Sequence, residues 1–235
     1  MTTNKKSAKT EIVVLIPCAG GGSRFGSNMP KQYTKIGDKT ILEHTLQAFL
    51  AVKLITKIVL VVSKNNEHFL SLLDKSILSN IDILTCGGNT RAKTVLNGLN
   101  SLNLDANSWI LVHDAARCCI TPELINKQIS TLFDDLVGGI LAIPAKDTIK
   151  IVKNNIIEQT LDRQTIYLAQ TPQMFRYNIL TQALRDSDIS NITDEASAVE
   201  KLGLSVRIIL GSPTNIKITY REDLAIATTI IGGTL

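Results

Sequence analysis

Aromatic side chains are scarce in this sequence of 235 residues, where they make up 4%. This scarcity argues against a surface for single-stranded nucleic acid, because such surfaces stack bases on aromatic rings. The formal net charge is only +4, whereas nucleic-acid-binding domains usually carry a larger, clustered basic excess. We therefore expect no nucleic-acid partner, and the modest positive charge suits a small anionic substrate.

Long apolar segments are also missing. No stretch approaches the ~18 apolar residues of a transmembrane helix. Basic residues at positions 5, 6 and 9 precede an apolar run and so imitate a signal peptide. Glu11 interrupts that basic region, and the apolar run ends soon afterwards at Pro17. These observations predict a cytoplasmic protein with no membrane partner.

The cysteines form no C-x-x-C pair, and no histidine cluster accompanies them. In a cytoplasmic chain, isolated cysteines are more often buried free thiols than disulfides or zinc ligands. We therefore expect free thiols at Cys18, Cys86, Cys118 and Cys119.

Apolar runs alternate with helical patterns along the chain. Strands are predicted at 12–17, 57–63, 81–86, 109–113, 139–144 and 205–210. Helices are predicted near 40–51, 66–74, 90–102, 121–136, 176–186, 194–202 and 221–231. This alternation is typical of an α/β, Rossmann-like fold, with a mostly parallel sheet and helices on both faces. The length suits one domain over residues 1–235.

Residues 147–159 interrupt this alternation. Strand-forming residues flank Asn154 and Asn155, which predicts a β-hairpin. Because a lone two-stranded hairpin is marginally stable in water, we expect this protruding arm to pack on a second subunit.

The most informative stretch is PCAGGGSRFGSNMPKQY at 17–33, which follows the first predicted strand. Its glycines allow backbone N–H groups to approach an anion, and Arg24 and Lys31 add positive charge. The stretch is not a P-loop, because Ser27 stands where the lysine belongs, nor a dinucleotide fingerprint, because Phe25 replaces the third glycine. Such a loop is a phosphate site or a structural corner, and the two cations favour phosphate.

Further segments follow in the chain. They are GGNTRAKTV (87–95), LVHDAAR (111–117), TPQMF (171–175), TDEASA (193–198) and NIK (215–217). With the glycine-rich stretch, they resemble the 2-C-methyl-D-erythritol 4-phosphate cytidylyltransferase family over nearly the whole chain. The resemblance implies that a polyol phosphate attacks the α-phosphorus of CTP and that pyrophosphate leaves, with Mg²⁺ as cofactor. No protein nucleophile is needed.

The resemblance also implies roles for individual residues. Arg24 and Lys31 would be catalytic, and Asp114 would hold Mg²⁺, through water. The residues implied for CTP are Pro17, Cys18, Ala19, Gly20, Gly21, Gly87, Gly88, Arg91, Thr94, Asp114 and Ala115. Those implied for the polyol phosphate are Arg117, Thr148, Arg163, Thr171, Thr193 and Lys217. In this family a β-arm links two subunits, so a homodimer is expected, with Arg163 reaching the neighbouring site.

The chain departs from the family at three positions. Cys118 replaces a usual proline, Asn89 stands where an acidic residue is frequent, and Thr94 replaces serine. Three other functions stay open at this stage: a ribitol 5-phosphate cytidylyltransferase, a nicotinamide-dependent oxidoreductase and a non-catalytic nucleotide sensor. Asp114 with Arg117, or Thr193, could also serve only to cap a strand or helix end.

Overall fold

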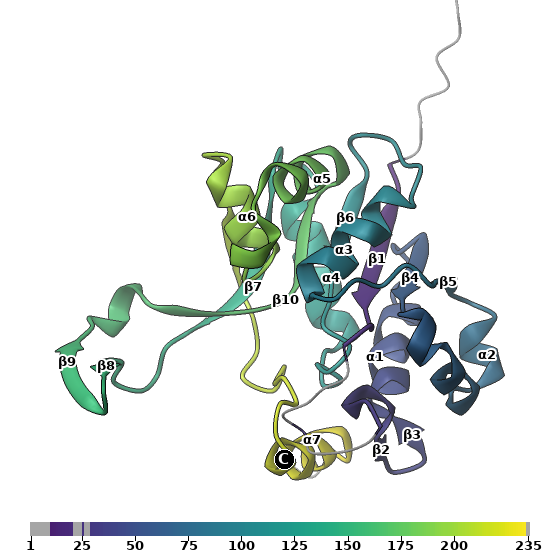
Figure 1. Cartoon of the computed structure of the whole chain (residues 1–235), viewed down its shortest axis with the longest axis horizontal. Coiled ribbons are helices and arrows are strands. Elements are labelled where there is room, and N and C mark those ends of the chain that lie inside the picture. The colour runs from purple at the N-terminus through teal and green to yellow at the C-terminus, as the bar shows by residue number, and fades with distance from the viewer. Residues whose placement is uncertain (1–9, 21–24, 26–28, 234–235) are drawn as a thin grey trace, which may run out of the picture.

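A seven-stranded sheet forms the centre of the computed structural model, which describes residues 10–20, 25 and 29–233 (Figure 1). From edge to edge its strands are β11 (Arg207–Leu210), β7 (Gly138–Pro144), β10 (Tyr167–Arg176), β6 (Trp109–Val112), β1 (Ile12–Pro17), β4 (Lys57–Val61) and β5 (Asp82–Leu84). Neighbouring strands pair in parallel, except that β10 is antiparallel to both β6 and β7. The predicted mostly parallel sheet is therefore confirmed.

Helices cover both faces of the sheet, as predicted. One face packs against α1 (Ile41–Leu50), α2 (Lys75–Leu78) and α4 (Pro122–Leu132). The other packs against α3 (Arg91–Asn100), α5 (Tyr177–Asp186) and α6 (Glu195–Lys201). Successive side chains of β1 alternate between these two cores, with Val14 in the first and Val13 in the second. This two-sided burial explains the continuous apolar run of the first strand.

Local sequence sets where several helices begin. Thr40 and Glu43 form a capping box at the start of α1. Thr121 caps α4 and Pro122 occupies its first turn, which are positions that threonine and proline favour. A third apolar cluster joins α7 (Glu222–Ile231), the small β2 (Lys35–Ile36)–β3 (Lys39–Thr40) hairpin and Phe25. Short 3₁₀ helices are η2 (Lys31–Tyr33), η3 (Lys64–Leu72), η4 (Arg163–Thr165) and η5 (Ile189–Asn191).

Three local predictions are wrong. Strand β10 was missed because Pro172 breaks its pattern, and the structure accommodates that proline at a register shift between Gln170 and Gln173. The helix expected at 66–74 is the 3₁₀ helix η3, followed by the short α2. The alternation of Ile216, Lys217 and Ile218 also predicts a short strand, but these residues are irregular backbone.

The predicted β-arm is present. Strands β8 (Lys150–Lys153) and β9 (Ile156–Thr160) stand away from the body in Figure 1. Asn154 and Asn155 join them with φ angles of 50° and 64°, as a tight hairpin turn requires. Within the described part of the chain, each helix is too short or too polar to cross a membrane.

Candidate active site

A cavity of about 360 Å³ lies at the carboxyl ends of β1 and β6, where open α/β sheets bind ligands. Its volume falls in the range of small-molecule sites. The loop after β1, the start of η2, the turn before α3, the loop after β6 and residue 217 contribute to it. Its lining residues are Pro17, Cys18, Ala19, Gly20, Lys31, Gln32, Gly88, Asn89, Thr90, Arg91, Thr94, Asp114, Ala115, Ala116 and Lys217.

The cavity brings together most of the predicted nucleotide residues. Of the two predicted catalytic cations, Lys31 lines it, whereas Arg24 lies outside the described residues, as does Gly21. Of the residues predicted for the polyol phosphate, only Lys217 is among its lining side chains. The others, Arg117, Thr148, Arg163, Thr171 and Thr193, lie behind it or elsewhere, so their roles stay predictions.

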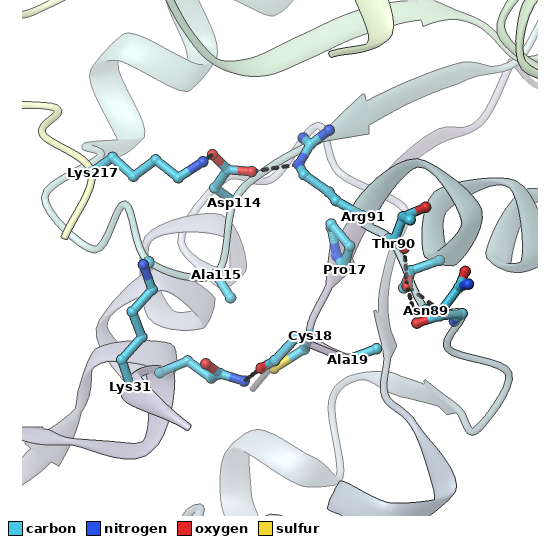
Figure 2. A pocket seen from close by; sticks show the side chains of 15 residues that line it. Pro17, Cys18, Ala19, Lys31, Asn89, Thr90, Arg91, Asp114, Ala115 and Lys217 are labelled. Atoms are coloured by element: carbon cyan, nitrogen blue, oxygen red, sulfur yellow. Dashed lines mark hydrogen bonds and ion pairs between the residues drawn. The ribbon is translucent and has the colours of Figure 1, made fainter. Parts of the chain in front are cut away.

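Asp114 is the charge centre of this cavity. Figure 2 shows Arg91 and Lys217 on either side of its carboxylate. Arg91 Nε lies 2.7 Å from Oδ1, Lys217 Nζ lies 2.8 Å from Oδ2 and Arg117 Nε lies 3.7 Å from Oδ2. Burial alone would raise the pKa of the Asp114 carboxyl, but these cations outweigh burial and hold the pKa far below its usual range. Asp114 is therefore ionised at neutral pH.

Glu195 completes this cluster and was not predicted to belong to it. Its buried carboxylate accepts hydrogen bonds from both terminal nitrogens of Arg91, at 2.7 and 3.0 Å. Burial alone would lower the pKa of Arg91, but Glu195 and Asp114 outweigh it and raise the pKa. The nearest sequence signal was the acidic pair at the start of α6. The helix cap is Asp194, which accepts from the Ser197 amide at 3.0 Å.

His113 and Thr171 support the Asp114 loop from behind. The Asp114 amide donates to Thr171 Oγ1 at 3.1 Å. Because the Arg117 carbonyl can only accept, the hydrogen of the neutral His113 ring lies on Nε2, and Nδ1 accepts from the Thr171 hydroxyl at 3.1 Å. His113 Nε2 then donates to the Arg117 carbonyl at 3.2 Å. Burial lowers the pKa of His113 to about 3. His113 is thus a neutral structural residue.

The predicted base-binding turn depends on close packing. A Cβ on Gly87 would lie 2.5 Å from Cβ of Ala19 and 2.9 Å from the Ser63 nitrogen, so only glycine fits there. Thr94 Oγ1 accepts from the Gly88 amide at 3.0 Å and donates to the Thr90 carbonyl at 2.9 Å. Thr94 therefore fixes the shape of the turn.

Lys31 lies across the cavity from Arg91, on η2. Its Nζ donates to the Ile218 carbonyl at 2.5 Å. Its neighbour Gln32 donates to the Gly20 carbonyl at 3.2 Å, which fixes the start of the glycine-rich loop. Cys18 follows β1 directly and is buried, and this burial raises the pKa of its thiol to about 12. All four cysteines are free, and Cys86 alone among them is only half-buried.

Two predicted substrate residues use their polar groups within the chain. Arg117 donates from Nη1 to the Asn215 carbonyl at 2.7 Å. Arg163 donates from Nη1 to the Lys146 carbonyl at 2.6 Å, at the base of the β-arm. Thr148 and Thr193 are exposed.

Known proteins match this chain along most of its length. The family model described as 2-C-methyl-D-erythritol 4-phosphate cytidylyltransferase matches residues 12–233. The protein of that name from Laribacter hongkongensis is 42% identical, and the match covers 95% of this chain and 97% of the relative. The protein of that name from Alteromonas mediterranea is 45% identical, and the match covers 92% of this chain and 91% of the relative. A crystal structure of a 4-diphosphocytidyl-2C-methyl-D-erythritol synthase is 38% identical, with a TM-score of 0.84, covering 96% of this chain and 100% of its own. The crystal structure of the Francisella tularensis 2-C-methyl-D-erythritol 4-phosphate cytidylyltransferase is 34% identical with a TM-score of 0.80, and the match covers 94% of this chain and 100% of that one.

Proposed function

Because this chain belongs to the 2-C-methyl-D-erythritol 4-phosphate cytidylyltransferase family, we propose that it joins CTP and 2-C-methyl-D-erythritol 4-phosphate. The products are 4-diphosphocytidyl-2-C-methyl-D-erythritol and pyrophosphate. The observation that carries this proposal is the cavity at the carboxyl ends of the strands, where Asp114 lies among cations and Lys31 faces it. Such a cavity suits a triphosphate and a second phosphate together.

The substrate phosphate is the nucleophile in this reaction. One of its oxygens attacks the α-phosphorus of CTP, a new P–O bond forms, and the bond to the oxygen bridging the α- and β-phosphates breaks. Pyrophosphate leaves with that electron pair. Because the attacking phosphate is already ionised, no general base is required, which agrees with the internal bonding of His113. Alignment and charge stabilisation then provide catalysis.

The charged residues divide between the two substrates. Lys31, together with Arg24, would neutralise the triphosphate and the charge that develops during transfer. Gly87, Gly88 and Thr94 would form the base and ribose side of the nucleotide site. Lys217 would supply a point charge to the polyol phosphate.

Mg²⁺ is part of the proposal. Among the described residues, no group of three or more His, Cys, Asp or Glu side chains converges on one point. Mg²⁺ commonly uses one or two carboxylates, with water and substrate phosphates as its other ligands. Asp114 fits that need, because its oxygens retain acceptor positions beyond their contacts with Arg91 and Lys217. When bound, Mg²⁺ would add positive charge beside the phosphates.

A homodimer and a cytoplasmic location also belong to the proposal. The β-arm exposes Val152, Ile156 and Ile157, with exposures of 54, 69 and 59%. Apolar side chains with such high exposure on a two-stranded arm favour contact with a second copy of the chain, which would cover them. Arg163, at the base of the arm, would then serve the partner's cavity.

A pyrophosphate-release assay tests the proposed function. Four nucleoside triphosphates are crossed with 2-C-methyl-D-erythritol 4-phosphate and ribitol 5-phosphate. We expect release to be fastest with CTP and methylerythritol phosphate. Faster turnover of ribitol 5-phosphate would reassign the substrate, and equal use of CTP and UTP would remove the base preference.

A further inference from the structure

One short segment, residues 215–218, serves two sides of the cavity. Its Lys217 lies 2.8 Å from Asp114 Oδ2, and its Ile218 carbonyl accepts from Lys31 Nζ at 2.5 Å. Lys31 and Lys217 are the lysines that line the cavity within the described part of the chain. The position of this irregular segment therefore sets where both ammonium groups lie.

The body of the protein anchors the segment from inside. Arg117 Nη1 donates to the Asn215 carbonyl at 2.7 Å, and Asn215 Nδ2 donates to the Thr171 carbonyl at 2.9 Å. The Ile218 amide donates to the Ala116 carbonyl at 2.9 Å. Asn215 and Ile218 are fully buried, so these anchors are shielded from water.

A single carboxylate holds the other end. Asp223 Oδ2 accepts from the amides of Thr219 and Tyr220, at 2.7 and 2.8 Å. Asp223 lies in the first turn of α7, and α7 itself packs in the third apolar cluster through Ala227. Just before that turn, Arg221 Nε donates to the Phe25 carbonyl at 3.3 Å. The start of α7 thus ties the chain after Lys217 to the glycine-rich loop.

We propose that Asp223 is a positioning residue for the reaction. By fixing the turn after Ile218, it keeps Lys217 against Asp114 and keeps the Ile218 carbonyl within reach of Lys31. Asp223 touches neither substrate. This inference rests on the proposed function, because its effect on catalysis passes through Lys217 and Lys31.

The test compares Asp223→Ala with Glu222→Ala, which removes the neighbouring charge from the same helical turn. Misplacement of a binding group by about 1 Å can cost roughly 100-fold in rate. We therefore expect Asp223→Ala to lower kcat/KM for methylerythritol phosphate by about 10- to 100-fold. Asp223→Asn keeps an oxygen acceptor, so its kcat/KM should stay much closer to that of wild type. Glu222→Ala should have a kcat/KM within about twofold of wild type, because it removes no hydrogen bond.

A double-mutant cycle separates positioning from general damage to the fold. Because Asp223 acts through both lysines, Asp223→Ala should cost at least about threefold less in a Lys217→Ala background than in wild type, since only the contribution through Lys31 remains there and coupled residues are not additive. The same cost in both backgrounds would overturn the inference. So would an Asp223→Ala enzyme as active as Glu222→Ala.

Amide hydrogen exchange gives a readout that needs no activity. Peptides covering residues 213–221 should exchange faster in Asp223→Ala than in wild type and Glu222→Ala. Faster exchange in Asp223→Ala, combined with a wild-type protein that releases no pyrophosphate, would support the anchoring and contradict the proposed function. Unchanged exchange would overturn the anchoring itself.

Discussion

Arg91 presents only its Nε to Asp114, at 2.7 Å. Its two terminal nitrogens are held by Glu195, whose side chain is 1% exposed. The guanidinium fork is therefore turned away from Asp114. Arg91 thus contacts only Oδ1 and leaves Oδ2 to Lys217, at 2.8 Å, and each oxygen keeps a further acceptor position.

Glu195→Gln tests this arrangement. Glutamine replaces one of the two acceptor oxygens with an NH2 donor, which repels the terminal nitrogen of Arg91 that faces it, so Arg91 should turn its fork toward Asp114. We expect CTP affinity to fall by about tenfold. The free energy of unfolding should fall by about 2 kcal/mol, which is less than for breaking a fully buried ion pair, because Arg91 keeps its ion pair with Asp114. Calorimetric titration with Mg²⁺ and CTP, beside thermal unfolding, measures both quantities. Glu200→Gln changes an exposed residue of the same helix and is the control. Unchanged CTP affinity in Glu195→Gln would contradict the role of Glu195 in orienting Arg91.

Lys31→Ala should lower turnover by about two to three orders of magnitude, as loss of a preorganised charge at the reacting centre does in other enzymes. The melting temperature should stay close to that of wild type, because Lys31 lies at the cavity rim and not in an apolar cluster. Steady-state pyrophosphate release and thermal unfolding test this together. Lys35→Ala, which removes an exposed lysine from β2, should leave turnover unchanged, and a Lys31→Ala enzyme within a few-fold of wild type would refute the catalytic role.

The buried, neutral state of His113 predicts a pH dependence of stability. Below pH 6.5 the unfolded chain takes up a proton at this histidine, whereas the folded protein does so only near a pKa of about 3. The unfolded state then binds more protons, so the free energy of unfolding should fall as pH drops, by up to about 1.4 kcal/mol per pH unit.

Urea unfolding at pH 7 and pH 4.5 isolates this effect. The pKa of Asp114 is lowered from 3.8 in the folded protein, so its contribution to the free energy of unfolding should be lost only at lower pH. His113→Asn should be less stable than wild type at pH 7 but should lose less stability on going to pH 4.5. An equal loss in the two proteins would show that His113 is not held neutral.

The proposed role of the β-arm predicts complementation between two inactive proteins. Lys31→Ala and Arg163→Ala subunits, unfolded and refolded together, should form mixed dimers with one intact site. About a quarter of wild-type activity is expected from random mixing of equal amounts, if Arg163 serves the partner's cavity. Mixed dimers confirmed by mass spectrometry but without activity would mean that Arg163 acts in its own subunit or not at all.

Features with a local cause were predictable from the sequence. The Thr121 and Pro122 helix start, the Asn154 turn and the alternation of strands with helices depend on residues close together in the chain. The link between Arg91 and Glu195 was missed because it joins residues 104 positions apart, on helices α3 and α6 that both pack against α5. Strand β10 was missed because only its pairing with β6 and β7 shows that Pro172 sits at a bulge.

The most direct test of the central claim follows oxygen atoms through the reaction. Methylerythritol phosphate carrying ¹⁸O in all three non-ester oxygens of its phosphate is incubated with CTP, Mg²⁺ and the protein, and the products are analysed by ³¹P NMR and mass spectrometry. Attack of the substrate phosphate on the α-phosphorus predicts that all the label stays in the cytidyl diphosphate product, with one labelled oxygen bridging its two phosphorus atoms, and that pyrophosphate is unlabelled. Label in pyrophosphate, or its absence from the bridging position, would contradict the account.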